Sequence, residues 1–331
     1  MTIDPKIRTK ALDTVRERRS NAQTEQARRT TEVYKRIPRI RQLDSEMRRD
    51  AAQAASQALR GGQDSAAALA RIRDDHLEKR AERAELLVAN GLPTDYLDIK
   101  YTCRRCNDTG YIGAEPCSCF KDLVRRYQVE ELSSMLDIRG KSFDTFDFSL
   151  YSSEIDPQHG VSPRENAESV FDFCADYARN FAVARDSLFL NGDTGLGKTF
   201  ISACIAREVA SSGFSVVYDT AVNIINWFER EHFSRDDSDA EKAVSRILNC
   251  DLLIVDDLGT ELTTAFTQSA LYALINSRLI SGRKSIISSN LTMLELRRRY
   301  TPQIVSRIDG EYKPLFFFGR DLRIVKRERE A

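Results

Sequence analysis

The chain has 331 residues, of which 41% are hydrophobic and 30% are charged, a composition typical of a folded protein with one large core and a smaller appendage. Its formal net charge is zero, and its apolar runs are shorter than the roughly 20 residues that a membrane-spanning helix needs. The first residues, MTIDPKIRTK, lack the apolar stretch of a secretory signal. These features argue against a membrane or secreted protein and predict a cytoplasmic one.

Residues 1–96 predict a charged helical region. Within residues 1–90, 20 Lys and Arg stand against 14 Asp and Glu, an excess of +6 (20 − 14) that modestly favours an anionic partner. Three dipeptides typical of helix starts or breaks divide the region: Asp4-Pro5, Ile37-Pro38 and Gly61-Gly62. The apolar stripe is too thin to form a core alone. These helices are therefore expected to pack on a partner, to self-associate or to form a solvated arm.

Residues 97–138 contain a cysteine cluster with the spacing C-x2-C-x10-C-x-C, followed by a helix. Its members are Cys103, Cys106, Cys117 and Cys119. Four thiolates on two short turns suit tetrahedral zinc, and in so short a segment the metal would supply most of the folding energy. Because the second pair is C-x-C, three cysteines with another ligand are an alternative, as are reactive or redox thiols. His76 lies earlier, on a charged helix where a solvated position is expected.

Residues 139–161 are predicted to be a linker, and an α/β domain is expected over 162–331. Ser162 to Glu165 form a capping box with proline at the first helical position. The strands expected after it are 187–191, 215–219, 251–255, 284–288 and 314–318. The helical patterns are 198–211, 221–232, 240–249, 266–281 and 293–299. Apolar strands separated by helices predict a parallel five-stranded sheet with helices on both faces.

The sequence GDTGLGKT, which starts at residue 192, matches the phosphate-binding pattern GxxxxGK[ST]. It follows an apolar strand and precedes a helix, the context that this pattern requires. Its residues are Gly192, Asp193, Thr194, Gly195, Leu196, Gly197, Lys198 and Thr199. The glycines let backbone N–H groups surround phosphate oxygens at the positive end of a helix. Lys198 is expected to reach the β- and γ-phosphates of ATP, and the Thr199 hydroxyl to ligate Mg²⁺.

Polar residues at the ends of two later strands complete the expected site. The segment LLIVDD ends in Asp256, expected to hold Mg²⁺ through water, and Asp257, expected to polarise the attacking water. After the next apolar strand, Asn290 is expected to orient that water against the γ-phosphate, although an Asn at a strand end is by itself typical of a turn. Arg307 and Arg323 are candidates to stabilise the charge of the transferred phosphoryl group, from the same or a neighbouring subunit.

The order of these motifs resembles one family. GDTGLGKT, LLIVDDLG, SSN, VSRI and FFFGRDLR look like the DnaC/DnaI-type helicase loaders, which are AAA+ relatives of the initiator DnaA and the transposition helper IstB. The segments 101–120 (YTCRRCNDTGYIGAEPCSCF) and 143–147 (FDTFD) are similar to the cysteine module of many Gram-positive members and to the lead into their ATPase domain. The resemblance covers about residues 98–325.

The resemblance implies an AAA+ P-loop fold and slow ATP hydrolysis. It further implies that the N-terminal part binds the hexameric replicative helicase, that the protein helps place this ring on single-stranded DNA, and that ATP drives self-assembly or assembly on the ring. By position, Asn290 corresponds to sensor 1, Arg307 to the arginine finger and Arg323 to the sensor 2 region. Asp257 departs from the Glu more common in AAA+ proteins, which leaves the hydrolysis rate open.

The family also carries a helical insertion that contacts single-stranded DNA, here about residues 221–249. Its aromatic and cationic residues are Trp227, Phe228, Arg230, Lys242 and Arg246. Such residues suit base stacking and phosphate contact, but aromatic residues at these positions are equally typical of a helix core. Two other functions stay open: an IstB-like transposition helper that binds double-stranded DNA, and an ATP-switched adaptor with little hydrolysis.

Overall fold

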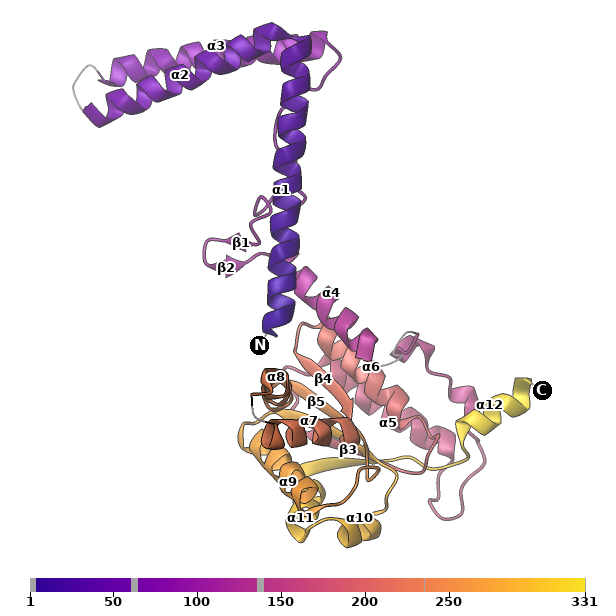
Figure 1. Cartoon of the computed structure of the whole chain (residues 1–331). Coiled ribbons are helices and arrows are strands. Elements are labelled where there is room, and N and C mark those ends of the chain that lie inside the picture. Colours follow the sequence, from indigo (N-terminus) through magenta and orange to yellow (C-terminus); the bar gives the residue numbers. More distant parts are fainter. Residues whose placement is uncertain (1–3, 61–64, 136–139, 235, 331) are drawn as a thin grey trace. The chain divides into compact units, whose positions relative to one another are not determined.

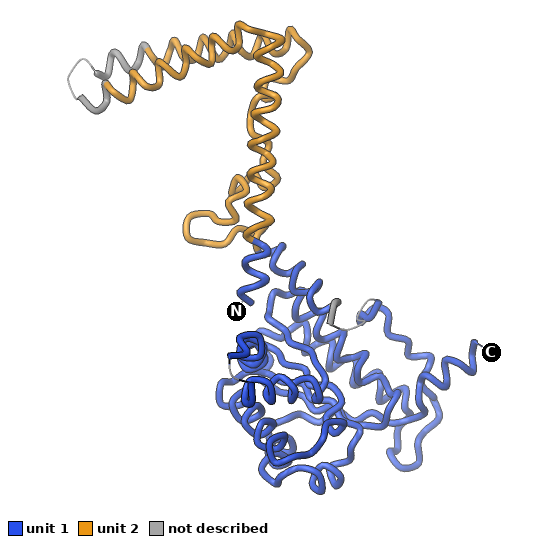
Figure 2. Tube along the Cα trace, viewed as in Figure 1, with its two compact units in different colours: residues 1–11, 121–331 blue, residues 12–120 orange. Residues whose placement is uncertain are grey.

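The computed structural model describes residues 4–60, 65–135, 140–234 and 236–330. These residues form two compact units, one of residues 12–120 (the helical unit) and one of residues 1–11 with 121–331 (the α/β unit; Figure 2). Among the described helices, none is both long and apolar enough to cross a membrane.

The α/β unit is built on a five-stranded sheet in the order β4-β5-β6-β3-β7, and every pair of neighbouring strands is parallel (Figure 1). The strands are β3 (Ser187–Asn191), β4 (Val216–Thr220), β5 (Leu252–Leu258), β6 (Lys284–Ser289) and β7 (Tyr312–Phe316). In this order β6 lies between β3 and β5. The α/β fold with a parallel five-stranded sheet that the sequence predicts is confirmed.

Both faces of the sheet are covered by helices. On one face, α5 (Pro163–Arg179) and α6 (Lys198–Ser211) share a core with Leu188 and Ile254. On the other face, the adjacent strand residues Phe189 and Leu253 share a core with helices that follow β4. These are α7 (Ala221–Phe233), α8 (Ser238–Asn249), α9 (Ala265–Ile280), α10 (Met293–Arg299) and α11 (Pro302–Glu311). The alternation follows from the two-residue period of a strand, which sends successive side chains to opposite faces.

Most expected elements match to within a residue or two, but two helices do not appear in the sequence analysis. One is α11, which begins at Pro302 behind the N-cap Thr301. The other is α12 (Leu322–Glu330), which is polar and has no buried side chain. Both are short, so neither offers the several turns of apolar periodicity on which a sequence-based helix assignment depends.

The helical unit contains α2 (Pro38–Arg60), α3 (Ser65–Ala89) and residues 12–36 of α1 (Pro5–Arg36). The break expected at Ile37-Pro38 separates α1 from α2, and the break expected at Gly61-Gly62 lies outside the described residues. One apolar cluster of the unit has the buried residues Val33, Ile37, Ile40, Leu87 and Leu97. A two-stranded antiparallel sheet, β1 (Tyr111–Ile112) with β2 (Glu115–Pro116), precedes α4 (Ser118–Met135).

The segment expected to be a linker contains two short 3-10 helices, η1 (Phe143–Thr145) and η2 (Phe148–Leu150). The rings of Phe146 and Phe171 lie 5.2 Å apart, so this segment packs on α5. The capping box of Ser162 and Glu165 at the start of α5 is present as the sequence predicts. The division into four domains (1–96, 97–138, 139–161 and 162–331) stays a prediction, because the two compact units do not test these four boundaries.

Candidate functional site

The phosphate loop connects β3 to α6, as the pattern requires. Gly192, Gly195 and Gly197 have φ values of +148°, +78° and +96°, a region that side chains rarely adopt. Space excludes a side chain as well, since a Cβ at Gly192 would collide with the carbonyl of Phe317 and one at Gly195 with the carboxylate of Asp321. The loop is therefore shaped by its glycines, with its backbone free to surround an anion.

Lys198 lies inside this loop and is 6% exposed. Its ammonium group donates hydrogen bonds to the carbonyl oxygens of Gly192 (2.5 Å) and Asp193 (2.7 Å). Burial lowers the pKa of Lys198, while the nearby carboxylates of Asp257 and Asp256 raise it. A desolvated ammonium held in this way attracts a phosphate more strongly than one in water does.

The carboxylate of Asp256 is 4% exposed, and both of its oxygens accept hydrogen bonds from hydroxyl groups on neighbouring strands. Tyr218 of β4 donates to one oxygen (2.8 Å), and Ser288 of β6 donates to the other. Burial and then the charge of Asp256 raise the pKa of Tyr218, whose hydroxyl also interacts with Thr199. The two residues expected to hold Mg²⁺ are thus linked through one buried tyrosine. Sequence reasoning missed Tyr218, because a tyrosine in a strand is ordinarily a core residue.

Asp257 leaves the sheet through a bulge. The pairing of β5 with β6 shifts between Val255 and Leu258, and Asp257 has a φ of +55°. Such a bulge redirects a side chain, so Asp257 reaches the cavity at the phosphate loop while Asp256 points into the sheet. Burial and then Asp256 raise the pKa of Asp257, whereas Lys198 and Arg323 lower it. These four charges therefore belong to one electrostatic group.

Asn290, Arg323 and Arg307 differ in their positions relative to the cavity at the phosphate loop. Asn290 is half-buried and directly follows β6, the strand between β3 and β5. Arg323 lines the cavity with Lys198. Arg307, half-buried on α11, does not line it and makes no hydrogen bond or ion pair with other described residues. The roles proposed for these residues stay predictions.

The cavity at the phosphate loop has a volume of about 850 Å³, within the range of ligand sites. Phe146, Leu150 and Tyr151 of the expected linker form an apolar wall, and Tyr151 donates a hydrogen bond to the carbonyl of Leu196 in the loop (3.0 Å). Cations outnumber acids in its lining. The cations are Lys141, Lys198, Arg323, Lys326 and Arg329, and the acids are Asp147, Asp257 and Glu330. One cavity thus combines an apolar wall suited to a base with cations suited to a polyphosphate.

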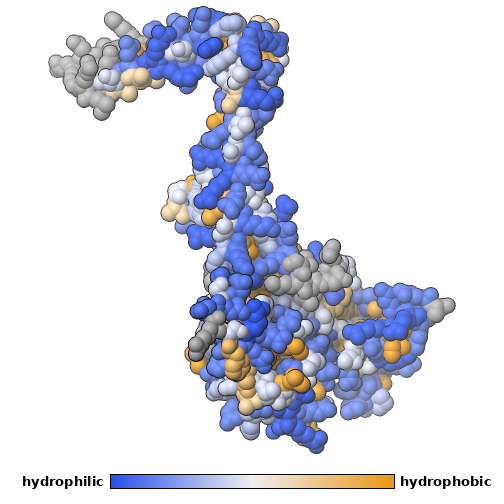
Figure 3. Space-filling model, viewed as in Figure 1, coloured by the Kyte–Doolittle hydropathy of each residue, from blue (hydrophilic) through white to orange (hydrophobic). Residues whose placement is uncertain are grey.

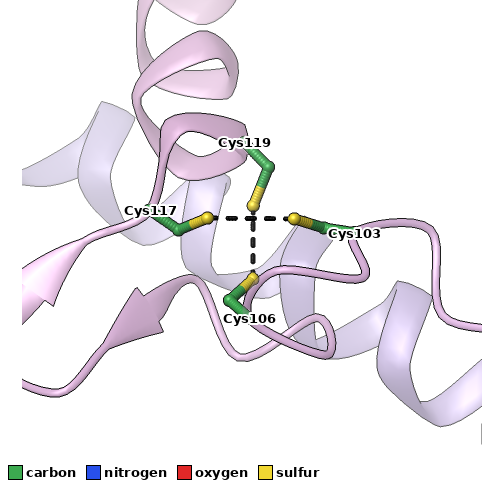
Figure 4. A group of neighbouring side chains, drawn as sticks. All are labelled: Cys103, Cys106, Cys117 and Cys119. Carbon is green, nitrogen blue, oxygen red and sulfur yellow. Dashed lines mark hydrogen bonds between the residues drawn. The ribbon is translucent and has the colours of Figure 1, made fainter.

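A second site lies in the helical unit, where the structure brings the four clustered cysteines together (Figure 4). Their sulfur atoms all lie within 4.8 Å of one another, and the Cys103–Cys117 and Cys106–Cys119 pairs are 3.8 and 3.5 Å apart. Four sulfurs at about 2.3 Å from a tetrahedral zinc ion would be roughly 3.8 Å apart, so the group fits zinc. His76 is not part of it, since its ring pairs with the carbonyl of Met47 (3.1 Å).

Local contacts prepare the cysteines to bind a cation. The carboxylate of Asp108, 2% exposed, accepts hydrogen bonds from the backbone N–H groups of Thr102 and Cys103 (both 2.8 Å) and fixes the first turn. Burial opposes ionisation of Cys106, but the backbone amide of Gly110 and the neighbouring thiols lower its pKa to about 7. A thiol of this kind readily loses its proton to become a thiolate, the form that binds metal.

The candidate DNA-contact residues of α7 and α8 differ in exposure: Trp227, Phe228 and Arg246 are partly buried, whereas Arg230 and Lys242 are exposed. Trp227 and Phe228 are partly buried against the core of the α/β unit. Arg230 lies over the ring of Trp227, 4.6 Å from its centroid. Arg246 forms ion pairs with Asp4 (2.7 Å) and Glu131 (3.0 Å). These contacts favour the structural interpretation of the aromatic pair.

Comparison with known proteins places these motifs in a family context. Residues 174–304 match the family described as "IstB-like ATP binding protein". The replicative helicase loader DnaI of Bacillus subtilis is 28% identical over 169 residues, covering 50% of this chain and 49% of DnaI. The loader DnaC of Escherichia coli K12 is 23% identical over 132 residues, covering 40% of this chain and 54% of DnaC. The resemblance to the DnaC/DnaI-type loaders is confirmed.

The chain spans about half the length of these DnaC/DnaI-type relatives. A crystal structure of the DnaC helicase loader has a TM-score of 0.45 and 18% identity, over 55% of this chain and 99% of that one. The matched family range contains the phosphate loop, Asp256, Asp257 and Asn290, and it ends three residues before Arg307 (307 − 304).

The link from Tyr218 to Asp256 and Thr199 predicts a specific effect on magnesium. Tyr218→Phe removes one hydroxyl, and we expect the Mg²⁺-dependent gain in nucleotide affinity to fall by about tenfold, roughly the net value of one buried hydrogen bond. Affinity without Mg²⁺ should be unchanged in a titration with a fluorescent nucleotide.

Tyr177→Phe is the matched control, because this buried tyrosine donates to the carbonyl of Asp186 (3.0 Å), away from the loop. It should bind nucleotide like the parent. Equal losses with and without Mg²⁺ in Tyr218→Phe would mean that the hydroxyl only supports the fold.

The cysteine group predicts a bound metal. Purified protein should carry about one zinc per chain by elemental analysis, held by four thiolates, and Cys106→Ser should lose most of it along with part of the thermal stability of the helical unit. Cys174→Ala, a fully buried cysteine of the α/β unit, should keep its zinc. A reduced parent protein without metal and with four cluster thiols reactive toward Ellman's reagent would contradict the assignment.

Proposed function

We propose that this protein is an ATP-dependent replication protein that binds the replicative helicase and loads it onto single-stranded DNA in the cytoplasm. The observation that carries the proposal is the cavity in which the phosphate loop, Asp257 and Arg323 converge, in a chain similar to the helicase loaders DnaC and DnaI. The partners are transferred from those relatives and are part of the proposal.

The proposed site divides its work among its residues. The loop backbone and Lys198 hold the β- and γ-phosphates, and the apolar wall of Phe146, Leu150 and Tyr151 takes the base. Thr199 and Asp256 hold Mg²⁺, which supplies charge neutralisation at the phosphoryl oxygens.

Hydrolysis is proposed to use Asp257 and Asn290 to orient the attacking water. Arg323 neutralises charge within the same subunit. Because Arg307 does not line its own cavity, we propose that it acts on a neighbouring subunit, either in self-assembly or in assembly on the helicase ring. Turnover is proposed to be slow, below the about 10 per second of a typical enzyme.

The rest of the chain is assigned by the same proposal. Residues 1–96 would be the helicase-binding arm, 97–138 the zinc module, 139–161 the linker that closes the nucleotide cavity, and 162–331 the AAA+ ATPase domain. An IstB-like transposition helper is the second candidate, favoured by the family match over residues 174–304.

Nucleotide binding is the first test. Lys198→Ala removes the only loop cation, and we expect ATP affinity to fall at least about 100-fold, as for loss of a charge-assisted contact to phosphate. Lys121→Ala, an exposed lysine on α4, should bind ATP like the parent. Tight ATP binding by Lys198→Ala in isothermal titration would remove the basis of the site.

The partner is tested separately by native mass spectrometry of the parent chain with the replicative helicase of its own source, with and without ATP. The loader function predicts a stoichiometric complex whose abundance changes with ATP, and Lys198→Ala should lose this sensitivity. If no complex forms under any nucleotide condition, the loader function fails, and a transposase becomes the partner expected of an IstB-like helper.

A further inference from the structure

The acidic residues of α2 are all committed to ion pairs. Asp44 pairs with Arg83 of α3 (3.1 Å), and Asp50 pairs with Lys79 of α3 (2.5 Å). Glu46, the remaining acid of α2, lies 3.5 Å from Arg39. Two ion pairs with α3 and one within α2 therefore neutralise the negative charge of this helix.

The basic residues on another face of α2 are left without such partners. Arg41, Arg48 and Arg49 are spaced by seven and eight positions (48 − 41 and 49 − 41), so they lie on one side of the helix. All three are exposed, and none forms an ion pair with a described carboxylate. Arg48 instead donates hydrogen bonds to the Tyr34 hydroxyl and the Asp44 carbonyl (both 3.2 Å).

The break at Pro38 turns this face of α2 toward the end of α1. Together they enclose an open hollow of about 760 Å³, which we call the basic hollow. Its lining consists of Thr31, Tyr34, Lys35, Arg41, Ser45, Arg48, Arg49 and Ala52. The lining holds four cations, three hydroxyl groups and no carboxylate. Figure 3 shows the surrounding surface of the helical unit as mostly hydrophilic.

We propose that the basic hollow binds the phosphate backbone of single-stranded nucleic acid, independently of the nucleotide cavity and of base sequence. Guanidinium groups and hydroxyls are the donors that phosphate oxygens accept. This contact lies in the helical unit, outside helices α7 and α8, and it adds a nucleic-acid site to the part of the chain otherwise proposed to bind a helicase.

An acidic protein segment would meet the same charges, but the lining favours the nucleic acid. Protein interfaces draw most of their affinity from buried aromatic and apolar anchors. The only aliphatic side chain here is that of Ala52, and the ring of Tyr34 packs into the core of the helical unit. Binding through charge alone is instead typical of phosphate backbones, where released counterions supply the driving force.

The test compares two triple variants of the full chain with equal loss of charge. The hollow variant is Lys35→Gln, Arg41→Gln and Arg49→Gln, which leaves the hydrogen-bonded Arg48 in place. The control variant is Arg19→Gln, Arg80→Gln and Arg104→Gln, three exposed arginines of the same unit outside the hollow. Binding of a short fluorescein-labelled oligothymidylate is measured by anisotropy without nucleotide over a range of salt concentrations.

We expect the hollow variant to bind at least about tenfold more weakly at low salt, and its slope of log affinity against log salt to fall by about 2, since each lost phosphate contact on a single strand contributes about 0.7. The control variant should stay close to the parent. Equal losses in both variants, or no loss in the hollow variant, would overturn the proposal.

Two further readouts separate this proposal from others. Polyglutamate that displaces the oligonucleotide as well as unlabelled oligothymidylate does would identify an acidic protein segment as the occupant and overturn the assignment to nucleic acid. Both triple variants should also keep parental ATP affinity, because no substituted residue lines the nucleotide cavity. The experiments can therefore contradict the proposal for the basic hollow without contradicting the ATP site, and the reverse.

Discussion

The phosphate site depends on the position of one strand, β6, between β3 and β5. Parallel strands end at the same edge of a sheet, so this order brings the loop after β3, the acids that end β5 and Asn290 after β6 side by side. Ser289, the last residue of β6, pairs with Asn191 at the end of β3 and with Leu258 at the end of β5, which aligns the three strand ends. Because β6 is the one strand between the phosphate loop and Asp256, Asn290 at its end lies between these two parts of the site.

At that edge of the sheet, the carboxylates of Asp256 and Asp257 differ in the hydrogen bonds they accept. Each oxygen of the Asp256 carboxylate accepts one hydrogen bond, from Tyr218 or from Ser288, which fixes its orientation and leaves lone pairs for a further partner. Asp257 has been turned outward by the bulge in β5, where Lys198 and Arg323 offset the repulsion from its neighbour. Two adjacent acids of one strand thereby acquire different environments and different chemical uses.

The sequence was sufficient for the sheet, the phosphate loop and the four cysteines, because each rests on short-range patterns such as apolar strands, fixed glycine spacing and paired thiols. It was insufficient where function depends on tertiary contacts. Tyr218 and Tyr151 look like ordinary core residues until strand order and the packing of the linker bring them to Asp256 and Leu196. Helix α12, which brings Arg323 to the cavity, has too few apolar residues to be recognised.

In the helical unit, the ion pairs between helices decide which charged side chains are left without a partner. Besides an apolar cluster, polar contacts hold its helices, such as Arg29 donating to the carbonyls of Tyr96 and Asp98 and the ion pairs between α2 and α3. The two acids of α2 in these pairs, Asp44 and Asp50, are partly buried. Because the bases outnumber the acids in this part of the chain, some cations are left without an ion pair, and Arg41, Arg48 and Arg49 lie in the basic hollow. The basic hollow is thus a consequence of how the ion pairs of α2 use its acidic residues.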